Sequence, residues 1–313
     1  MGGPPVTLDM PWPAPRDRYR YVPIGARPGG RWPNGRRLAV YVAVGVEDYR
    51  FGDGHTENLL PGVAFPDMVN TAWRDYGNRV GVFRLLQRLH EYGIPPTVLL
   101  NTMVYDSAPA VPLAARRLGA EIVGHGVTNS DSLAGLGQPE ELAYLAAVAG
   151  RIAAEEGAPP GGWSSPWLAH TESTPDLLAA AGYRYLLDLR PDDQPVWLAT
   201  TSTPLLAVPY ALELNDSSTV IGRGAGAAEF ADMIVDEFEE LLAAAEERPL
   251  VMSVVLHSYI SGVPFRLRQL SRALAHLRAH ADDVWFTQPG EIYRAFAAVV
   301  PPPSGVEQAG ARD

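Results

Sequence analysis

Residues 38–46 read LAVYVAVGV, a nearly continuous run of β-branched and other apolar side chains without polar alternation. A strand with one face in water alternates apolar and polar residues, whereas a parallel strand covered on both faces does not. The run therefore predicts a parallel strand buried on both sides. Two carboxylates, Glu47 and Asp48, follow it directly. In barrels of parallel strands, the chemistry lies at this carboxyl end of the strand.

The rest of the chain alternates helical and strand patterns. After a long segment, 49–78, apolar spacing predicts helices over 79–92, 109–118, 139–156, 174–181, 227–248 and 267–280. Between them, short apolar runs predict strands at 97–100, 120–123, 183–189, 205–208, 250–256 and 283–287. Such alternation implies parallel strands with helices outside.

We therefore predict an α/β fold, a distorted (β/α)7–8 barrel of parallel strands. A single barrel domain is expected over 38–300, after an N-terminal arm, 1–37, and before a flexible tail, 301–313. An open doubly wound sheet is the alternative. No G-x-G-x-x-G motif follows the first strand, so a dinucleotide site in such a sheet is unsupported.

The composition restricts the function. The 313 residues hold 25 Lys and Arg against 36 Asp and Glu, a net charge of −11, which argues against nucleic acid or an anionic membrane surface as partner. Cysteine is absent, so a metal site must use His, Asp, Glu or Asn. The N-terminus lacks the pattern of a signal peptide, and no apolar run approaches the roughly 20 residues of a membrane span. We expect a cytoplasmic protein with a small-molecule substrate.

Four predicted strands end in polar side chains: Glu47 with Asp48, His125 with Asn129, Asp192 with Asp193, and His257. Because the carboxyl ends of parallel strands form one rim, we expect these groups to converge. Carboxylates and imidazoles on one rim can act as the general acids and bases of a hydrolysis reaction. Segment 49–78 is too long for an ordinary connection, and we expect it to fold over this rim.

Several segments carry a resemblance to a known family: RWPNGRRLAVYVAVGVEDY, DYGNRVGVFRLLQRL, EIVGHGVTNS, GYRYLLDLRPDDQP, VPYALELND, LHSYISGVPFRLRQL and TQPGEI. They span residues 31–292 and resemble the polysaccharide deacetylase superfamily, carbohydrate esterase family 4. The chain is more similar to the branch of cofactor-independent allantoinases and cyclic imide hydrolases. The resemblance implies a deacetylase-type barrel and a hydrolase of non-peptide carbon–nitrogen bonds.

The chain departs from the deacetylase motifs. The family ends its first strand with two aspartates, a base and a metal ligand, where this chain has Glu47 and Asp48. Of the two metal-binding histidines in the second motif, His125 remains and Asn129 replaces the other. An amide oxygen is a poor Zn²⁺ ligand. We therefore expect no cofactor, and at most a weakly bound divalent ion such as zinc on Asp48, His125 and Asn129.

Two further motifs complete the expected site. Ser164 stands where the family has an arginine that orients the base, and His257 keeps the histidine that the family uses as general acid. The predicted catalytic residues are Glu47, Asp48, His125 and His257. Glu47 or Asp48 would activate water with help from His125, and His257 would protonate the leaving nitrogen or stabilise the oxyanion. The predicted substrate-binding residues are Asn129, Ser165, Trp167, Asp193 and Tyr259.

Three functions follow from these residues. The first is the ring opening of a small cyclic amide, imide or ureide, as in the allantoinase-like branch. The second is a metal-dependent N-deacetylase of an acetylated sugar or polysaccharide, which Asn129 and Ser164 disfavour. The third is a non-catalytic binding protein on the same barrel. The arm carries Arg16, Tyr19 and Tyr21 and suggests a homo-oligomer, unless it lies on its own subunit.

Overall fold

The computed structural model describes residues 18–303, and within this range nine strands form one sheet. Their order is β6-β7-β5-β4-β3-β2-β1-β8, with β9 paired to β1. All pairs are parallel except β6 with β7. The bounds are β1 Leu38–Val46, β2 Pro96–Leu100, β3 Glu121–Gly124, β4 Gly162–Trp163, β5 Tyr185–Leu186, β6 Val196–Leu198, β7 Leu205–Ala207, β8 Leu250–His257 and β9 Val284–Phe286.

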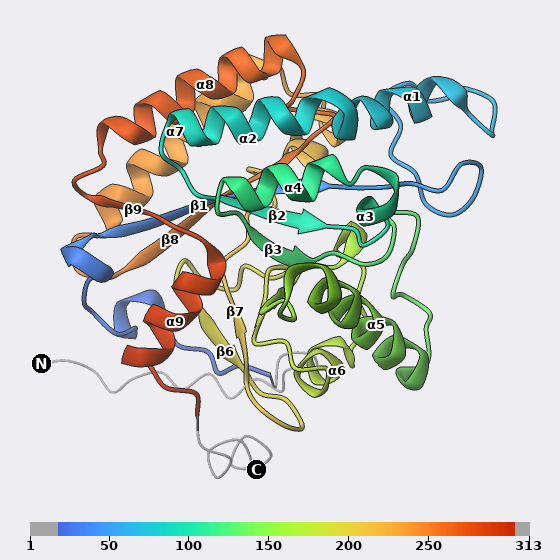
Figure 1. The fold of residues 1–313 in the computed structure, drawn as a ribbon. Coiled ribbons are helices and arrows are strands. Elements are labelled where there is room, and N and C mark those ends of the chain that lie inside the picture. The colour runs from blue at the N-terminus through green and yellow to red at the C-terminus, as the bar shows by residue number, and fades with distance from the viewer. Residues whose placement is uncertain (1–17, 304–313) are drawn as a thin grey trace, which may run out of the picture.

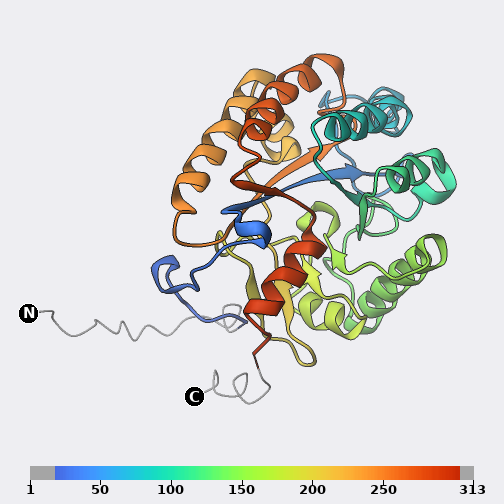
Figure 2. The ribbon, with the colours of Figure 1, turned by 60° about the vertical axis from the view of Figure 1, so that its left-hand side comes forward.

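Helices surround this sheet (Figure 1), and Figure 2 shows α7, α8, α2, α4 and α5 as an outer ring around the strands. Their bounds are α1 Met68–Tyr76, α2 Val82–Glu91, α3 Val104–Ser107, α4 Ala110–Arg117, α5 Gln138–Glu156, α6 Thr174–Ala180, α7 Ala227–Ala244, α8 Pro264–Ala279 and α9 Pro289–Val299. Every residue of β1 is buried, as its uniform apolar pattern predicts. The helices cover one face of the central strands, and on the other face alternate residues of β1 pack inside the barrel against side chains of β5, β7 and β8.

The sheet curls into an incomplete barrel. Its two end strands, β6 and β8, are not paired with each other in the strand order. Loop residues bridge the gap instead, because the amides of Val251 and Val255 in β8 donate to the carbonyls of Asp193 and Leu214 at 2.9 and 2.8 Å. The predicted distorted α/β barrel of parallel strands is confirmed.

Several elements of the fold differ from the sequence prediction, among them two helices. Segment 49–78 contains helix α1, which Asp67 caps by accepting hydrogen bonds from the amides of Val69 and Asn70. Sequence periodicity missed this helix because its apolar residues Met68 and Val69 are exposed, so no apolar stripe marks it. Helix α9 begins at Pro289, in a segment for which the sequence analysis predicts no element, although proline is favoured in the first helical turn.

The N-terminal arm packs on its own chain where it is described. Arg18 pairs with Asp176 at 2.7 Å, Arg27 pairs with Asp192 at 2.7 Å, and the indole of Trp32 donates to the carbonyl of Leu250. Residues 1–17, with Arg16, and residues 304–313 of the predicted tail lie outside the described range. Homo-oligomerisation stays a prediction. Among the described helices, none has the length and apolarity needed to cross a membrane.

Candidate active site

Strands β1 and β8 bring a carboxylate and an imidazole together. Glu47 follows β1, and His257 ends β8 directly beside Gly45. A Cβ atom on Gly45 would lie 2.8 Å from Cδ2 of His257, so glycine makes room for the ring. His257 Nε2 lies 3.3 Å from Oε1 of Glu47, and His125 Nε2 lies 3.5 Å from the same oxygen. All three side chains are buried.

Asp216 fixes His257 from the other side. Its carboxylate is fully buried and accepts from Nδ1 of His257 at 2.6 Å, from the His257 amide and from the hydroxyl of Ser261. Burial alone would lower the pKa of His257, but the charges of Glu47 and Asp216 outweigh it and raise this pKa well above its usual value. The geometry thus holds an imidazolium between two carboxylates.

Glu47 is correspondingly held in its ionised form. Burial alone would raise its pKa, but the charge of His257 and hydrogen bonds from both imidazoles hold this pKa well below its usual value. His125 binds the carbonyl of Ser164 through Nδ1 at 2.7 Å. A carbonyl only accepts, so Nδ1 carries the proton and Nε2 faces Glu47. The site therefore sets one carboxylate against two imidazoles.

Two tyrosines hold the second oxygen of Glu47. The hydroxyls of Tyr49 and Tyr259 lie 2.6 and 2.7 Å from Oε2. The side-chain amide of Asn129 donates to the Tyr49 hydroxyl at 2.8 Å, while its own oxygen is buried and has no hydrogen-bond partner in the described structure. A buried acceptor without a donor is costly unless a ligand supplies one. Asn129 Oδ1 is therefore placed to accept an N–H group.

Glu47 and both histidines line a cavity of about 160 Å³. Six predicted site residues line it, and one further carboxyl does, from the segment before α1: Glu47, His125, Asn129, Ser165, Trp167, His257 and Glu57. At its edge Trp167 and Leu168 have φ values of 59° and 52°, in the left-handed region that side chains rarely adopt. The indole of Trp167 donates to the carbonyl of Asn129 at 2.6 Å. Such strain costs roughly 1–3 kcal/mol per residue and concentrates at functional sites.

Asp48 does not line this cavity, in contrast to the prediction. Successive side chains of a strand point to opposite sides, and Asp48 accepts a hydrogen bond from the Ser107 hydroxyl instead. Asp48, His125 and Asn129 therefore do not form a ready metal-binding set around the cavity. The carboxylate that faces both imidazoles is that of Glu47.

The prediction that Asp193 joins this rim is wrong. Its carbonyl accepts from Val251 near the start of β8, the end opposite His257, and its carboxylate pairs with Arg190 at 3.0 Å. The reason is that β5 ends at Leu186, earlier than predicted, so the chain has already turned back. The carboxylate that does follow β5 is Asp188, which is buried and accepts from the Ser165 amide at 2.7 Å.

Sequence reasoning also missed Asp216 and Glu57. Asp216 lies in the motif VPYALELND, but no apolar strand leads directly into it, so the strand-end signal is absent. The resemblance of that motif was the only available signal. Tyr259, predicted to bind substrate, is buried behind Glu47 and does not line the cavity.

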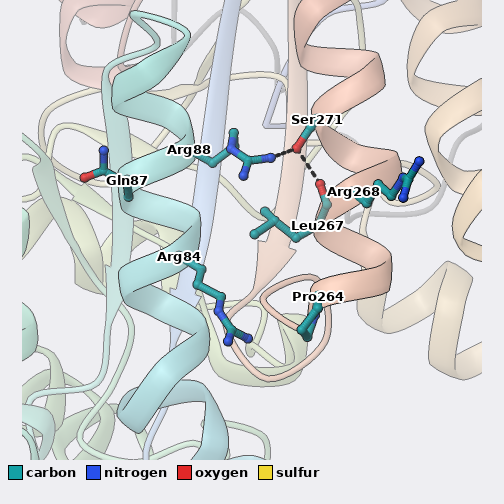
Figure 3. A pocket seen from close by; sticks show the side chains of 7 residues that line it. All are labelled: Arg84, Gln87, Arg88, Pro264, Leu267, Arg268 and Ser271. Carbon is teal, nitrogen blue, oxygen red and sulfur yellow. Dashed lines mark hydrogen bonds between the residues drawn. The ribbon is translucent and has the colours of Figure 1, made fainter.

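Two other features of the surface, a groove and a cluster of side chains, do not combine a carboxylate and imidazoles with burial. A groove of about 420 Å³ between α2 and α8 is larger, but Figure 3 shows it lined by arginines and neutral side chains without a carboxylate or imidazole. Among the residues described, one set of three His or acidic side chains brings its ligand atoms within 4.8 Å of one another. It lies on α7 and α8 and comprises Glu239, His276 and His280.

Comparisons with known proteins agree with this fold. No family model matches the chain. A Schizosaccharomyces pombe protein described as a polysaccharide deacetylase is 25% identical over 311 residues, covering 89% of this chain and 95% of that protein. The crystal structure of Puue allantoinase matches with a TM-score of 0.78 and 26% identity, over 88% of this chain and 96% of the other. A Pseudomonas aeruginosa PAO1 protein described as a probable polysaccharide deacetylase gives the same TM-score, identity and coverage.

These likenesses cover 88 to 89% of the chain. The sequence resemblance and the fold thus lead to the same group of proteins. The chain is accordingly similar to polysaccharide deacetylases and to an allantoinase, which agrees with a hydrolase of carbon–nitrogen bonds.

Proposed function

We propose that this protein opens the ring of a small cyclic amide, imide or ureide by hydrolysis of a carbon–nitrogen bond. The observation that carries the proposal is the ionised, buried carboxylate of Glu47 between two imidazoles in the wall of a small cavity. Typical ligand pockets measure about 300–1,000 Å³. A cavity of about 160 Å³ suits one compact ring better than a polysaccharide chain.

In this proposal Glu47 is the base and His257 the acid. Oε1 of Glu47 accepts a proton from water as the oxygen of that water bonds to the carbonyl carbon. Nε2 of His257 gives its proton to the leaving ring nitrogen when the carbon–nitrogen bond breaks. The 3.3 Å contact between the two side chains then returns the proton from Glu47 to His257 and restores the starting state.

Other residues orient the ring. Asn129 Oδ1 accepts a ring N–H group, which supplies the donor that this buried oxygen lacks. Nε2 of His125, 3.5 Å from Oε1 of Glu47, contacts the attacking water and keeps it beside Glu47. Asp216 keeps Nε2 of His257 facing the cavity by holding Nδ1. These contacts position the reactants, which is a major part of catalysis.

We further propose that the reaction uses no metal ion. A metal held as in the deacetylases would need the Asp48 carboxylate in the cavity, but that group binds Ser107. The alternative of a metal-dependent N-deacetylase therefore requires Asp48 to reorient and Asn129 to act as a ligand. This requirement separates the two functions experimentally.

The test is turnover of a panel of substrates with and without chelator: allantoin, succinimide, dihydrouracil and N-acetylglucosamine oligomers. We expect ring opening of at least one cyclic compound that survives the chelator and disappears in Glu47→Gln. Deacetylation of the oligomers that the chelator abolishes would overturn the proposal. Binding of a panel compound without any turnover would support the non-catalytic alternative instead.

A further inference from the structure

Glu57 reaches the active site from the segment that precedes α1. Its side chain is buried and lines the cavity. One oxygen, Oε1, accepts from the hydroxyl of Ser217 at 2.6 Å, and the other, Oε2, lies 2.6 Å from the hydroxyl of Tyr259. The same tyrosine hydroxyl lies 2.7 Å from Oε2 of Glu47. Tyr259 thus joins two carboxyl groups.

The number of protons decides the state of this cluster. Four oxygens, those of Tyr49, Tyr259, Glu47 Oε2 and Glu57 Oε2, make four contacts of 2.6 to 2.9 Å. With both carboxylates ionised only the two hydroxyl protons are present. Tyr259 then donates to one carboxylate and faces the other without a proton between the oxygens. A third proton removes this repulsion.

Glu57 is the site for the third proton. The two imidazoles favour the ionised form of Glu47, and no cation lies at hydrogen-bond distance from the Glu57 carboxyl in the described structure. A protonated carboxyl has one acceptor oxygen and one donor oxygen. Ser217 supplies the donor to Oε1, and Tyr259 offers the acceptor to Oε2. The surroundings therefore match the neutral acid.

We propose that Glu57 is a positioning residue of the active site, a protonated acid that donates to Tyr259 so that Tyr259 donates to Glu47. The chain of hydrogen bonds satisfies Oε2 of Glu47 and leaves Oε1 as the basic oxygen that faces His257 and the cavity. The protonation of Glu57 does not depend on the proposed function, whereas its effect on catalysis rests on that function. Glu57, and not Asp48, is thus the second carboxyl group of the site.

The charges around Glu57 agree with this assignment. Burial raises its pKa and outweighs the opposing effects of the His257 charge and of hydrogen bonds from Ser217 and Tyr259, while the charge of Glu47 adds to the rise. Arg74 of α1 lies on the backbone side of Glu57, where it donates to the Glu57 carbonyl at 2.7 Å, and its guanidinium stacks 4.9 Å from the centre of the Tyr49 ring. Arg74 thereby fixes the segment that delivers Glu57.

Infrared spectroscopy tests the protonation without any substrate. We expect a protonated carboxyl band at neutral pH that shifts in D₂O and is lost in Glu57→Gln. The matched control is Glu121→Gln, because Glu121, at the far end of β3, is half-buried and also lies beside a tyrosine hydroxyl, that of Tyr185 at 2.7 Å. This control should keep the Glu57 band. A Glu57→Gln spectrum without loss of such a band would overturn the inference.

Kinetics test the positioning role. An amide at position 57 still donates to Tyr259 and accepts from Ser217, so Glu57→Gln should lower kcat only a few-fold. Glu57→Ala removes the donor and should lower kcat by about 10- to 100-fold, with urea unfolding as the check that both variants fold. Equal losses in the two variants would contradict the donor role, and activity retained in Glu57→Ala would exclude positioning. If no ring compound is turned over, the proposed function fails while the infrared result still decides the state of Glu57.

Discussion

The protein contains two clusters of one glutamate and two histidines, and their surroundings differ. The buried cluster comprises Glu47, His125 and His257, and the surface cluster comprises Glu239, His276 and His280. In each, one carboxylate oxygen faces both imidazoles, at 3.3 and 3.5 Å in the buried cluster and at 2.6 and 3.8 Å in the surface cluster. The same three side chains therefore occur twice.

The difference lies in burial and in the groups behind the three side chains. In the surface cluster Glu239 is exposed and the histidines are half-exposed, and exposed ion pairs contribute only about 0–1 kcal/mol. The side chains of the buried cluster are largely shielded from solvent, and Asp216, Tyr49 and Tyr259 satisfy its remaining atoms. Charges interact more strongly in such surroundings. Side-chain type alone does not make a catalytic site; enclosure and orientation by neighbours do.

Exchanging each glutamate for glutamine is the change with the largest expected contrast. Glu47→Gln removes the base and should lower kcat/KM by about 10²- to 10⁴-fold. Glu239→Gln makes the same chemical change on the surface and should leave kcat/KM within about twofold of wild type. The measurement is the steady-state rate with whichever panel compound is turned over. Equal effects of the two variants would remove the distinction between the clusters.

Asp216→Asn should have the next largest effect, because it takes away the orienting charge that the surface cluster lacks. Removing one partner of a buried ion pair costs about 3–5 kcal/mol of unfolding free energy. His257 has a raised pKa in the folded protein, so its stabilising contribution is full below its unfolded pKa of about 6.5 and is lost as pH rises through the folded value. Urea unfolding from pH 5 to 9 should therefore show a weaker loss of stability with rising pH in the variant. An unchanged pH dependence would mean that Asp216 does not hold the charge on His257.

Zinc should bind the surface cluster and leave the reaction unaffected. Two imidazoles and a carboxylate are zinc ligands, and an ion at 100 times its Kd stabilises a protein by about 2.7 kcal/mol. Zinc should therefore raise Tm in the wild type and not in His276→Ala, while chelator leaves turnover of both unchanged. Zinc found in purified protein consequently does not by itself indicate a metal enzyme. A zinc-dependent rate in His276→Ala would contradict metal-free catalysis.

The sequence predicted the buried cluster because strand patterns are regular. Glu47 and His257 directly follow apolar runs, and parallel strands align their carboxyl ends, so convergence followed from the pattern. Asp216 and Glu57 come from irregular segments, where no period relates sequence position to direction. Asp193 was misplaced because a strand boundary was set a few residues too late. The barrel was thus predictable, and the neighbours that tune its site were not.

The state of His257 as an imidazolium between Glu47 and Asp216 is measured directly, and without substrate, by ¹⁵N NMR titration of this histidine. Both ring nitrogens of His257 should stay protonated as pH rises past about 6.5, and the proton should be lost at lower pH in Glu47→Gln than in the wild type. Loss of the His257 proton at or below pH 6.5 in the wild type would show that the two carboxylates do not hold an imidazolium.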